Sequence, residues 1–379
     1  MNWNRVIVLA AAALAVAAIV AGCCTSNDIL GGSIAEFAFV SNETSNNVNA
    51  YSVSSSTGAL TPVTGSPFAG DTGPRGVAVY PSGKFLYMAN ESSNDISAYT
   101  INASSGALTP VPGSPFAEGE GENYGPRGVA VDPSGKFLYV ANEVGNNVSA
   151  FSIDATSGAL TQITGSPFAA ETGPRGVAVD PSGKYVYVTN HGDDDASAYS
   201  ITAATGALTP VPGSAFATGS TPFDVVVDPS GKFVYVTNHL SGNVSAYTLA
   251  AATGALTPVP GSPFTAGSQP HGVVVDPSGK FVYVANHGSN NVSAYSINAA
   301  SGALTELAGS PFADTSSQEG VTAPYGLAVD PSGKFVYVAN NGTGDVSAYS
   351  VDATSGVLTE VGTFAAGTGP HGVAVARPQ

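Results

Sequence analysis

The tetrapeptide PSGK occurs six times along this chain, beginning at Pro81, Pro133, Pro181, Pro229, Pro277 and Pro331. Successive copies lie 52, 48, 48, 48 and 54 residues apart. Repeats of this length are typical of arrays in which each unit is a small group of elements that packs on its neighbours. The repeat therefore constrains the fold more strongly than any local pattern does.

Each unit is predicted to contain four short strands. The run GVAVD at 128–132 consists of small and β-branched apolar residues up to its final Asp, as expected of a strand that is buried on both faces. A DPSGK turn leads into a second strand such as FVYVAN at 281–286, and Asp, Pro and Gly each favour such a turn. A third strand follows, such as NVSAYSI at 291–297. The fourth strand of each unit, such as ALTPVPGSPF at 255–264, contains prolines that suit an outer edge. Four antiparallel strands per repeat describe a propeller blade.

The two ends of the repeated region determine the number of blades. Residues 37–53 supply a second and a third strand with no first strand before them, whereas residues 368–379 supply a first strand with nothing after it. Each end completes the other, so that the last strand closes the ring and leaves no open sheet edge. We therefore predict an all-β, seven-bladed propeller that forms one domain over residues 36–379.

The N-terminus resembles a bacterial lipoprotein signal. A charged MNWNR start, an apolar run from Val6 to Val20 and the small residues Ala21 and Gly22 precede Cys23. The run is short for a bilayer-spanning helix, which is the alternative interpretation. We expect a signal peptide over residues 1–22, a lipid on Cys23, a tether over residues 23–35 and a monomer anchored to the cell envelope by the lipid alone.

Composition and motifs exclude several classes of function. The formal net charge of −16 argues against nucleic acid and against an anionic membrane surface as partners. The sequence contains no GxSxG, HExxH or P-loop motif, and a GxGxxG match at 367–372 leads into a predicted strand rather than a helix, so a serine triad, zinc proteolysis and nucleotide chemistry have no support. No spacing in the chain is typical of a metal site, and we expect neither a metal nor a cofactor.

The strand directions place sequence variation on one face of the ring. Because strands alternate in direction, the residues before each first strand and after each second strand meet on the same face. The opposite face carries the nearly invariant DPSGK and SGALT turns. Two long connections, at 117–125 and 313–323, also fall on the variable face, where binding residues are usually found.

Two positions per blade on the variable face hold all of the imidazole groups and most of the guanidinium groups. All five histidines and three of the five arginines occupy these positions. The first slot, just before the first strand, holds Arg75, Arg127, Arg175, Phe223, His271, Tyr325 and His371. The second slot, just after the second strand, holds Glu43, Glu91, Glu143, His191, His239, His287 and Asn341.

The repeated pattern resembles the seven-bladed lactonase family, relatives of 6-phosphogluconolactonase and of carboxymuconate-lactonising cyclases. The resemblance rests on the PSGK and GP-R/H-G motifs and on YVTN at 187–190 and 235–238, and it covers residues 35–379. It implies catalytic roles for Arg75, Glu91, Arg127, Glu143, Arg175 and His371. The other members of the slots, Glu43, His191, His239, His271, His287 and Tyr325, are then expected to bind ligand.

One departure from the family pattern concerns the residue after each arginine. Family members commonly have His at that position, whereas this chain has Gly76, Gly128 and Gly176. A Glu could still act as general base on water while an Arg stabilises the oxyanion. In the alternative interpretation, the Arg and Glu side chains only neutralise one another at the rim.

Two functions follow from these observations. The first is an envelope-anchored lactonase that hydrolyses a sugar lactone or another lactone, unphosphorylated because an exported protein does not meet cytoplasmic sugar phosphates. The second is a non-catalytic propeller lipoprotein that binds a glycan, a peptide or an envelope protein on the variable face. Convergence of Arg75, Glu91 and His371 on one pocket would favour the first function.

Overall fold

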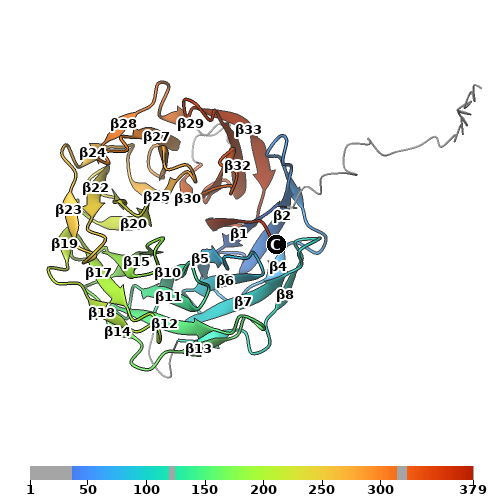
Figure 1. The fold of residues 1–379 in the computed structure, drawn as a ribbon. Coiled ribbons are helices and arrows are strands. Elements are labelled where there is room, and N and C mark those ends of the chain that lie inside the picture. Colours follow the sequence, from blue (N-terminus) through green and yellow to red (C-terminus); the bar gives the residue numbers. More distant parts are fainter. Residues whose placement is uncertain (1–35, 119–123, 314–321, 379) are drawn as a thin grey trace, which may run out of the picture. The chain divides into compact units, whose positions relative to one another are not determined.

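The computed structural model describes residues 36–378, apart from 119–123 and 314–321, and in this part of the chain all regular structure is β-strand. Seven antiparallel sheets surround a central axis (Figure 1). The predicted seven-bladed propeller is confirmed. No helix that could span a bilayer occurs among these residues. The predicted signal peptide, the tether and Cys23 lie outside them, as does most of both long connections.

The innermost strand of each blade starts at a proline on the variable face. Its first residue pairs with the second strand, its next two residues form a bulge, and pairing resumes at its fourth residue. In β10, for example, the bulge separates Pro126 from Val129. The first-slot residue and the residue after it lie in this bulge and are released from the ladder. The inner strands are β34 (Pro370–Ala376), β5 (Pro74–Val79), β10 (Pro126–Val131), β15 (Pro174–Val179), β20 (Pro222–Val227), β25 (Pro270–Val275) and β30 (Pro324–Val329).

The second and third strands form the buried middle of each blade. The second strands are completely buried. They are β1 (Glu36–Asn42), β6 (Phe85–Asn90), β11 (Phe137–Asn142), β16 (Tyr185–Asn190), β21 (Phe233–Asn238), β26 (Phe281–Asn286) and β31 (Phe335–Asn340). The third strands are β2 (Asn47–Val53), β7 (Asp95–Ile101), β12 (Asn147–Ile153), β17 (Asp195–Ile201), β22 (Asn243–Leu249), β27 (Asn291–Ile297) and β32 (Asp345–Val351).

The predicted outer strand is divided into two short segments in six blades. At the gap, the Ser66 hydroxyl accepts a hydrogen bond from the Ala50 N–H at 3.0 Å. The sequence GSP interrupts the ladder in five of these blades because proline has no N–H to donate. The outer strand of the seventh blade, β33 (Leu358–Ala365), has no proline and is continuous. The divided segments are β3 (Leu60–Pro62) and β4 (Phe68–Ala69), β8 (Leu108–Pro110) and β9 (Phe116–Ala117), β13 (Leu160–Gln162) and β14 (Phe168–Ala169), β18 (Leu208–Pro210) and β19 (Phe216–Ala217), β23 (Leu256–Pro258) and β24 (Phe264–Thr265), and β28 (Leu304–Glu306) and β29 (Phe312–Ala313).

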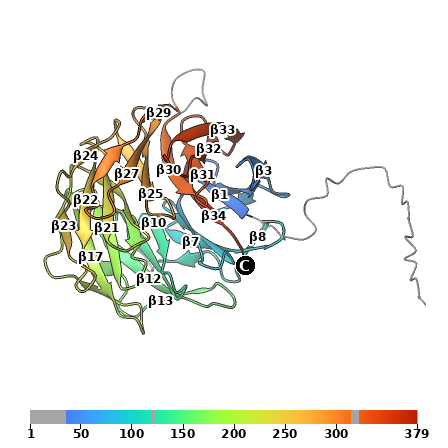
Figure 2. The ribbon, with the colours of Figure 1, turned by 45° about the horizontal axis from the view of Figure 1, so that its top comes forward.

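The C-terminal strand closes the ring. β34 pairs antiparallel with β1, with Phe37 opposite Ala376 and Val40 opposite Val373. Figures 1 and 2 show the two strands side by side, although they stand at opposite ends of the repeated region. The predicted closure is therefore confirmed, and one sheet holds strands from both ends of the chain.

The hydrophobic core is divided into seven clusters that lie between neighbouring blades rather than within them. One cluster joins Tyr187 of β16 to Val225 and Val234 of the next blade. The Tyr187 hydroxyl donates a 2.9 Å hydrogen bond to the Gly254 carbonyl of that blade. Each blade is thus stabilised by both of its neighbours, which explains how one domain exceeds the size of a single core.

The face opposite the slots is built from nearly identical turns, with Tyr80 in place of the Asp in one of them. The Asp180 carboxylate accepts hydrogen bonds from the backbone N–H groups of Ser182, Lys184 and Tyr185 at 2.7–3.0 Å. Asp228, Asp276 and Asp330 make the same three bonds. This face therefore repeats one local structure, and blade-specific chemistry lies on the other face.

Candidate functional site

The two slots of each blade are held side by side by the backbone. The N–H of Glu91 donates to the Gly73 carbonyl at 2.9 Å, and the N–H of His191 donates to the Gly173 carbonyl at 2.9 Å. Gly73 and Gly173 stand two residues before the first-slot residues Arg75 and Arg175. Rigid strand ends therefore bring both slots of every blade to the same rim of the central axis.

Arginine and glutamate side chains form an alternating chain across four blades. Arg75 pairs with Glu43 at 2.8 Å and with Glu91. Arg127 pairs with Glu91 at 3.0 Å and with Glu143, which in turn pairs with Arg175 at 2.7 Å. Side-chain exposure in this chain of ion pairs ranges from 13% to 31%. Most of these ion pairs join neighbouring blades, so they also fix the distance between the blades at the rim.

Burial and neighbouring charge shift the pKa values in this chain of ion pairs. Burial opposes the charge of Glu143, but Arg127 and Arg175 outweigh it and hold the pKa of Glu143 below its usual value. Burial and the nearby Arg127 cation lower the pKa of Arg175. Within the described residues Arg175 has a single carboxylate partner, so it is the cation that an added anion would stabilise most.

Aromatic and imidazole rings continue the rim through the remaining blades. The Arg175 guanidinium lies 5.0 Å from the centroid of the Phe223 ring, which stacks on His271 at 4.0 Å. His271 contacts the Tyr325 ring edge-on at 4.3 Å, and Tyr325 contacts His371 at 3.8 Å. Arg75 Nη1 then donates to His371 Nε2 at 3.1 Å. The seven first-slot side chains, bridged by Glu91 and Glu143 between the arginines, thus form one closed ring of polar and π contacts.

The second-slot histidines lie outside this ring. His239 Nδ1 and His271 Nε2 share a hydrogen bond of 2.9 Å, and His287 stacks on His271 at 4.5 Å. His191 lies within electrostatic range of Arg175 and Glu143. Within the described residues, no group of three or more His, Cys, Asp or Glu side chains is arranged to hold a metal ion.

All five histidines are held in their neutral form. Burial is the largest cause in each case, and it lowers the pKa of His191 to about 4. The pKa values of His239, His271 and His287 are lowered as well. Burial and then the Arg75 cation lower the pKa of His371 well below 6.5. Neutral imidazoles can stack and accept protons, but they add no positive charge to the rim.

The lowered pKa of His371 predicts a pH-dependent difference in stability. Below pH 6.5 the unfolded chain binds a proton at His371 that the folded protein does not, so the folded state loses stability as the pH falls. His371→Gln removes this effect. As the pH is lowered from 6.5 to 5, the free energy of unfolding of wild type should therefore fall by up to about 1.4 kcal/mol per pH unit relative to that of the variant. Denaturant titrations at several pH values measure it, with Asn341→Gln as a non-titrating control; a parallel pH response of wild type and His371→Gln would contradict the prediction.

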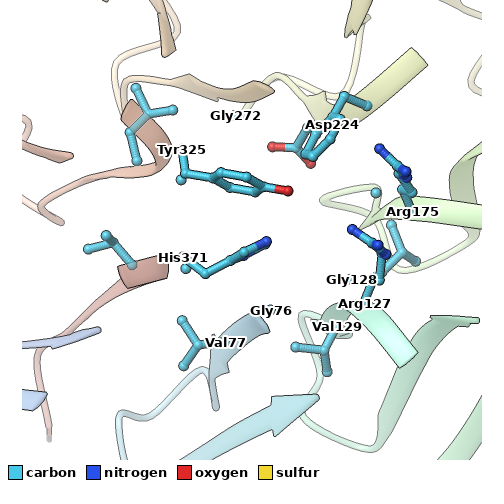
Figure 3. Close-up of a pocket in the computed structure, with 17 residues that line it drawn as sticks. Gly76, Val77, Arg127, Gly128, Val129, Arg175, Asp224, Gly272, Tyr325 and His371 are labelled. Carbon is cyan, nitrogen blue, oxygen red and sulfur yellow. The ribbon is translucent and has the colours of Figure 1, made fainter. Parts of the chain in front are cut away.

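A cavity of about 170 Å³ opens at the axis inside the first-slot ring. Figure 3 shows Arg127 and Arg175 on one side, Tyr325 and His371 opposite them, and Asp224 between the two groups. Phe223 also lines the cavity, together with apolar residues of the inner strands. Of the residues predicted to be catalytic, Arg127, Arg175 and His371 line this cavity, as does Tyr325, which was predicted to bind ligand. Arg75, Glu91 and Glu143 contact the lining residues, and the remaining slot residues surround them.

Steric crowding explains the glycines that follow the first-slot arginines. A Cβ on Gly76 would collide with the Arg127 carbonyl oxygen, and one on Gly128 would collide with the Arg175 carbonyl oxygen. Gly272, Gly326 and Gly372 also lie too close to the next inner strand to accept a Cβ. The imidazole that the family pattern places after Arg has no room here unless the inner strands move apart.

The threonine of YVTN holds neighbouring inner strands together. Thr189 Oγ1 accepts from the Gly176 N–H at 2.8 Å and donates to the Phe223 carbonyl at 3.0 Å. In the next blade, Thr237 Oγ1 accepts from the Asp224 N–H at 3.1 Å and donates to the His271 carbonyl. The motif therefore fixes the backbone beneath Phe223 and His271.

Asp224 is a cavity residue that the sequence prediction missed. It occupies the position that holds glycine in the other six blades. It is the one acidic residue among the cavity-lining residues of the described chain. An alignment of the seven inner strands by position would have found it, since Asp interrupts an otherwise uniform column.

Comparison with known proteins identifies the family. The model of the family described as "Lactonase, 7-bladed beta-propeller" matches residues 25–121, 116–266 and 258–375. The chain belongs to this family. A search of curated protein sequences finds no match to this lactonase-family protein.

Solved structures share the fold of this lactonase-family protein at low identity. The periplasmic gluconolactonase of Pseudomonas aeruginosa is 21% identical, with a TM-score of 0.72, and covers 91% of this chain and 100% of its own. Candidate 6-phosphogluconolactonases of Bacteroides uniformis and Bacteroides fragilis are 18% and 21% identical, both with a TM-score of 0.74. Their alignments cover 91% and 93% of this chain and 100% of each of theirs. At this identity the likeness shows the fold alone.

Proposed function

We propose that this lactonase-family protein hydrolyses a lactone in the cavity inside the first-slot ring. The observation that carries the proposal is the polarised cavity, with the guanidinium groups of Arg127 and Arg175 on one wall and the rings of Tyr325 and His371 on the other. A lactone presents a flat, partly apolar ring and an ester carbonyl. Stacking on the ring wall would direct the carbonyl oxygen toward the guanidinium groups.

The electrostatics of the cavity suit ester hydrolysis. Attack of water on the carbonyl places negative charge on the carbonyl oxygen, and preorganised donors stabilise that charge in a site with little water. Arg175 is disfavoured as a cation by burial and by Arg127, so a new anion beside it would relieve that cost. These two arginines therefore stabilise the transition state more than the neutral substrate.

We expect the substrate to be an unphosphorylated sugar lactone. The net charge of −16 repels a phosphate ester at long range. The proposed lipid anchor at Cys23 would place the domain in the cell envelope, away from cytoplasmic sugar phosphates. The Pseudomonas aeruginosa protein of the same fold is described as a periplasmic gluconolactonase, which is consistent with such a substrate.

A binding module is the second candidate function. Glu43, Glu91 and Glu143 are all engaged in ion pairs with arginine, which leaves none of the three as an unpaired base. The ring wall could stack against a glycan without any reaction. Binding of a sugar by wild-type protein with no hydrolysis of its lactone would favour this function.

A pH-stat assay of the domain starting at residue 24 tests the two candidates. The substrates are a panel of sugar lactones and aromatic lactones. We expect hydrolysis of at least one lactone, and a loss of about tenfold or more in Glu91→Gln and Glu143→Gln, because each carboxylate holds two guanidinium groups in place at the rim. Lys136→Gln on the opposite face is the control. Failure of wild-type protein to hydrolyse any lactone, or rates unchanged in both Glu variants, would contradict the proposal.

A further inference from the structure

Asp224 brings a carboxylate into the cavity at a position where the other blades have no side chain. It is the third residue of β20, directly after the first-slot residue Phe223. Figure 3 shows it beside the space between Tyr325 and the two arginines. It keeps partial solvent exposure because it borders the cavity, although protein atoms enclose it on all other sides.

Main-chain contacts hold the Asp224 carboxylate in one orientation. Oδ1 accepts from the Val225 N–H at 2.9 Å, and Oδ2 accepts from the Val273 N–H of the next blade at 3.1 Å. The Asp224 N–H donates to Thr237 Oγ1 at 3.1 Å. Each carboxylate oxygen can accept a second hydrogen bond, which a water in the cavity can supply.

The other rim carboxylates have cationic partners, whereas Asp224 forms no ion pair with any residue of the described chain. The lowered pKa of Glu143 makes that group a weak base. Asp224 is therefore the carboxylate whose basicity is not reduced by direct contact with a guanidinium. The charged and titratable groups that line the cavity with Asp224 are Arg127 on β10, Arg175 on β15, Tyr325 on β30 and His371 on β34. His271 on β25 stacks on Phe223, another lining residue.

We propose that Asp224 is the general base of the lactonase reaction, an inference that rests on the proposed function. The Asp224 carboxylate takes a proton from water as the water oxygen forms a bond to the lactone carbonyl carbon, and the carbonyl oxygen becomes an anion beside Arg127 and Arg175. When this intermediate collapses, the carbonyl re-forms and the ring C–O bond breaks. The proton on Asp224 passes to the departing alkoxide. The product is a hydroxy acid, which loses its carboxyl proton to solvent, and Asp224 returns to its starting state.

The ionisation of Asp224 suits this role near neutral pH. Burial raises its pKa to about 6, against the opposing effect of the two backbone hydrogen bonds. A base with a pKa close to the working pH is ionised yet still basic enough to accept a proton. We therefore expect kcat/KM to fall as the pH drops below about 6.

Two variants test the role of Asp224. Asp224→Asn keeps the shape of the side chain, and Asp224→Gly installs the residue that the other six blades have at this position. Both should lower kcat by roughly 10²–10⁴-fold while changing KM by less than about threefold. The acid limb of the pH profile should disappear. Sodium formate should increase the rate of Asp224→Gly at least about tenfold over its rate without formate, because formate fits the vacated space and supplies the missing carboxylate.

The outcomes separate this inference from the function on which it rests. Circular dichroism and thermal unfolding first establish that the variants fold. Rescue of Asp224→Gly by formate, with none for Glu91→Gln, supports the inference. Wild-type hydrolysis together with full activity in folded Asp224→Gly overturns the inference and leaves the proposed function standing. A wild-type protein that hydrolyses no lactone on the panel overturns both.

Discussion

Arg175→Ala is expected to lower kcat/KM for lactone hydrolysis by roughly 10²–10³-fold, the typical effect of removing one oxyanion donor. Arg175 lines the cavity and, within the described chain, keeps only one carboxylate partner, Glu143. Its positive charge is disfavoured by burial and by Arg127, and this cost falls when a negative charge develops nearby. The loss should therefore appear mainly in kcat, with a smaller change in KM. Initial rates on the best lactone of the panel measure it.

Arg377→Ala is the matched control for Arg175→Ala. Arg377 also pairs with a carboxylate, that of Glu36, but it follows β34 at the end away from the slots. The same substitution there removes one positive charge and one ion pair without touching the cavity. Equal losses in both variants would mean that the charge acts through stability or long-range attraction, and would contradict a role for Arg175 in the transition state.

Removal of residues 370–379 should abolish cooperative folding of the propeller. The deletion takes away β34, leaves β1 unpaired on its inner side and opens the cores on both sides of that blade. Val373 and Ala376 belong to different inter-blade clusters, so one deletion damages two interfaces. The expected loss is comparable to the whole stability of a typical domain, about 5–15 kcal/mol. Far-ultraviolet circular dichroism during urea titration measures it.

A permuted chain supplies the control for this deletion. In it, residues 370–376 precede Glu36 through a DPSGK turn, and the chain ends at Gly369. Every strand of the propeller is present, but the closing strand is now joined to its partner by a hairpin. We expect the permuted protein to fold with a sharp transition. A truncated protein as stable as the permuted one would show that closure by β34 contributes little.

The repeat explains why the fold could be predicted from the sequence. The PSGK period gave the blade length, and the incomplete units at 37–53 and 368–379 gave both the number of blades and the closing strand. The direction of successive strands then placed the slots on one rim. These inferences depend on periodicity and strand alternation, which local sequence encodes directly.

The chemistry of the rim could be predicted only in part. The sequence indicated that Arg75 and Glu91 lie near one another, but whether the chain of ion pairs leaves a free base depends on the distance between blades. The stack from Phe223 to His371 likewise forms only when the ring is closed. Asp224 escaped prediction because the run around it has the apolar pattern of a buried strand. The division of the outer strands follows from prolines that an uninterrupted edge strand could also tolerate, so the sequence pattern alone does not reveal it.

The close approach of the inner strands at their glycines has a consequence for redesign. Since the main chain sets the spacing of the inner strands at that level, exchanging first-slot side chains changes the lining that a ligand meets without moving the strands apart. A combinatorial library confined to those seven positions would explore new specificities on a constant backbone. Widening the backbone ring itself would instead require an additional blade.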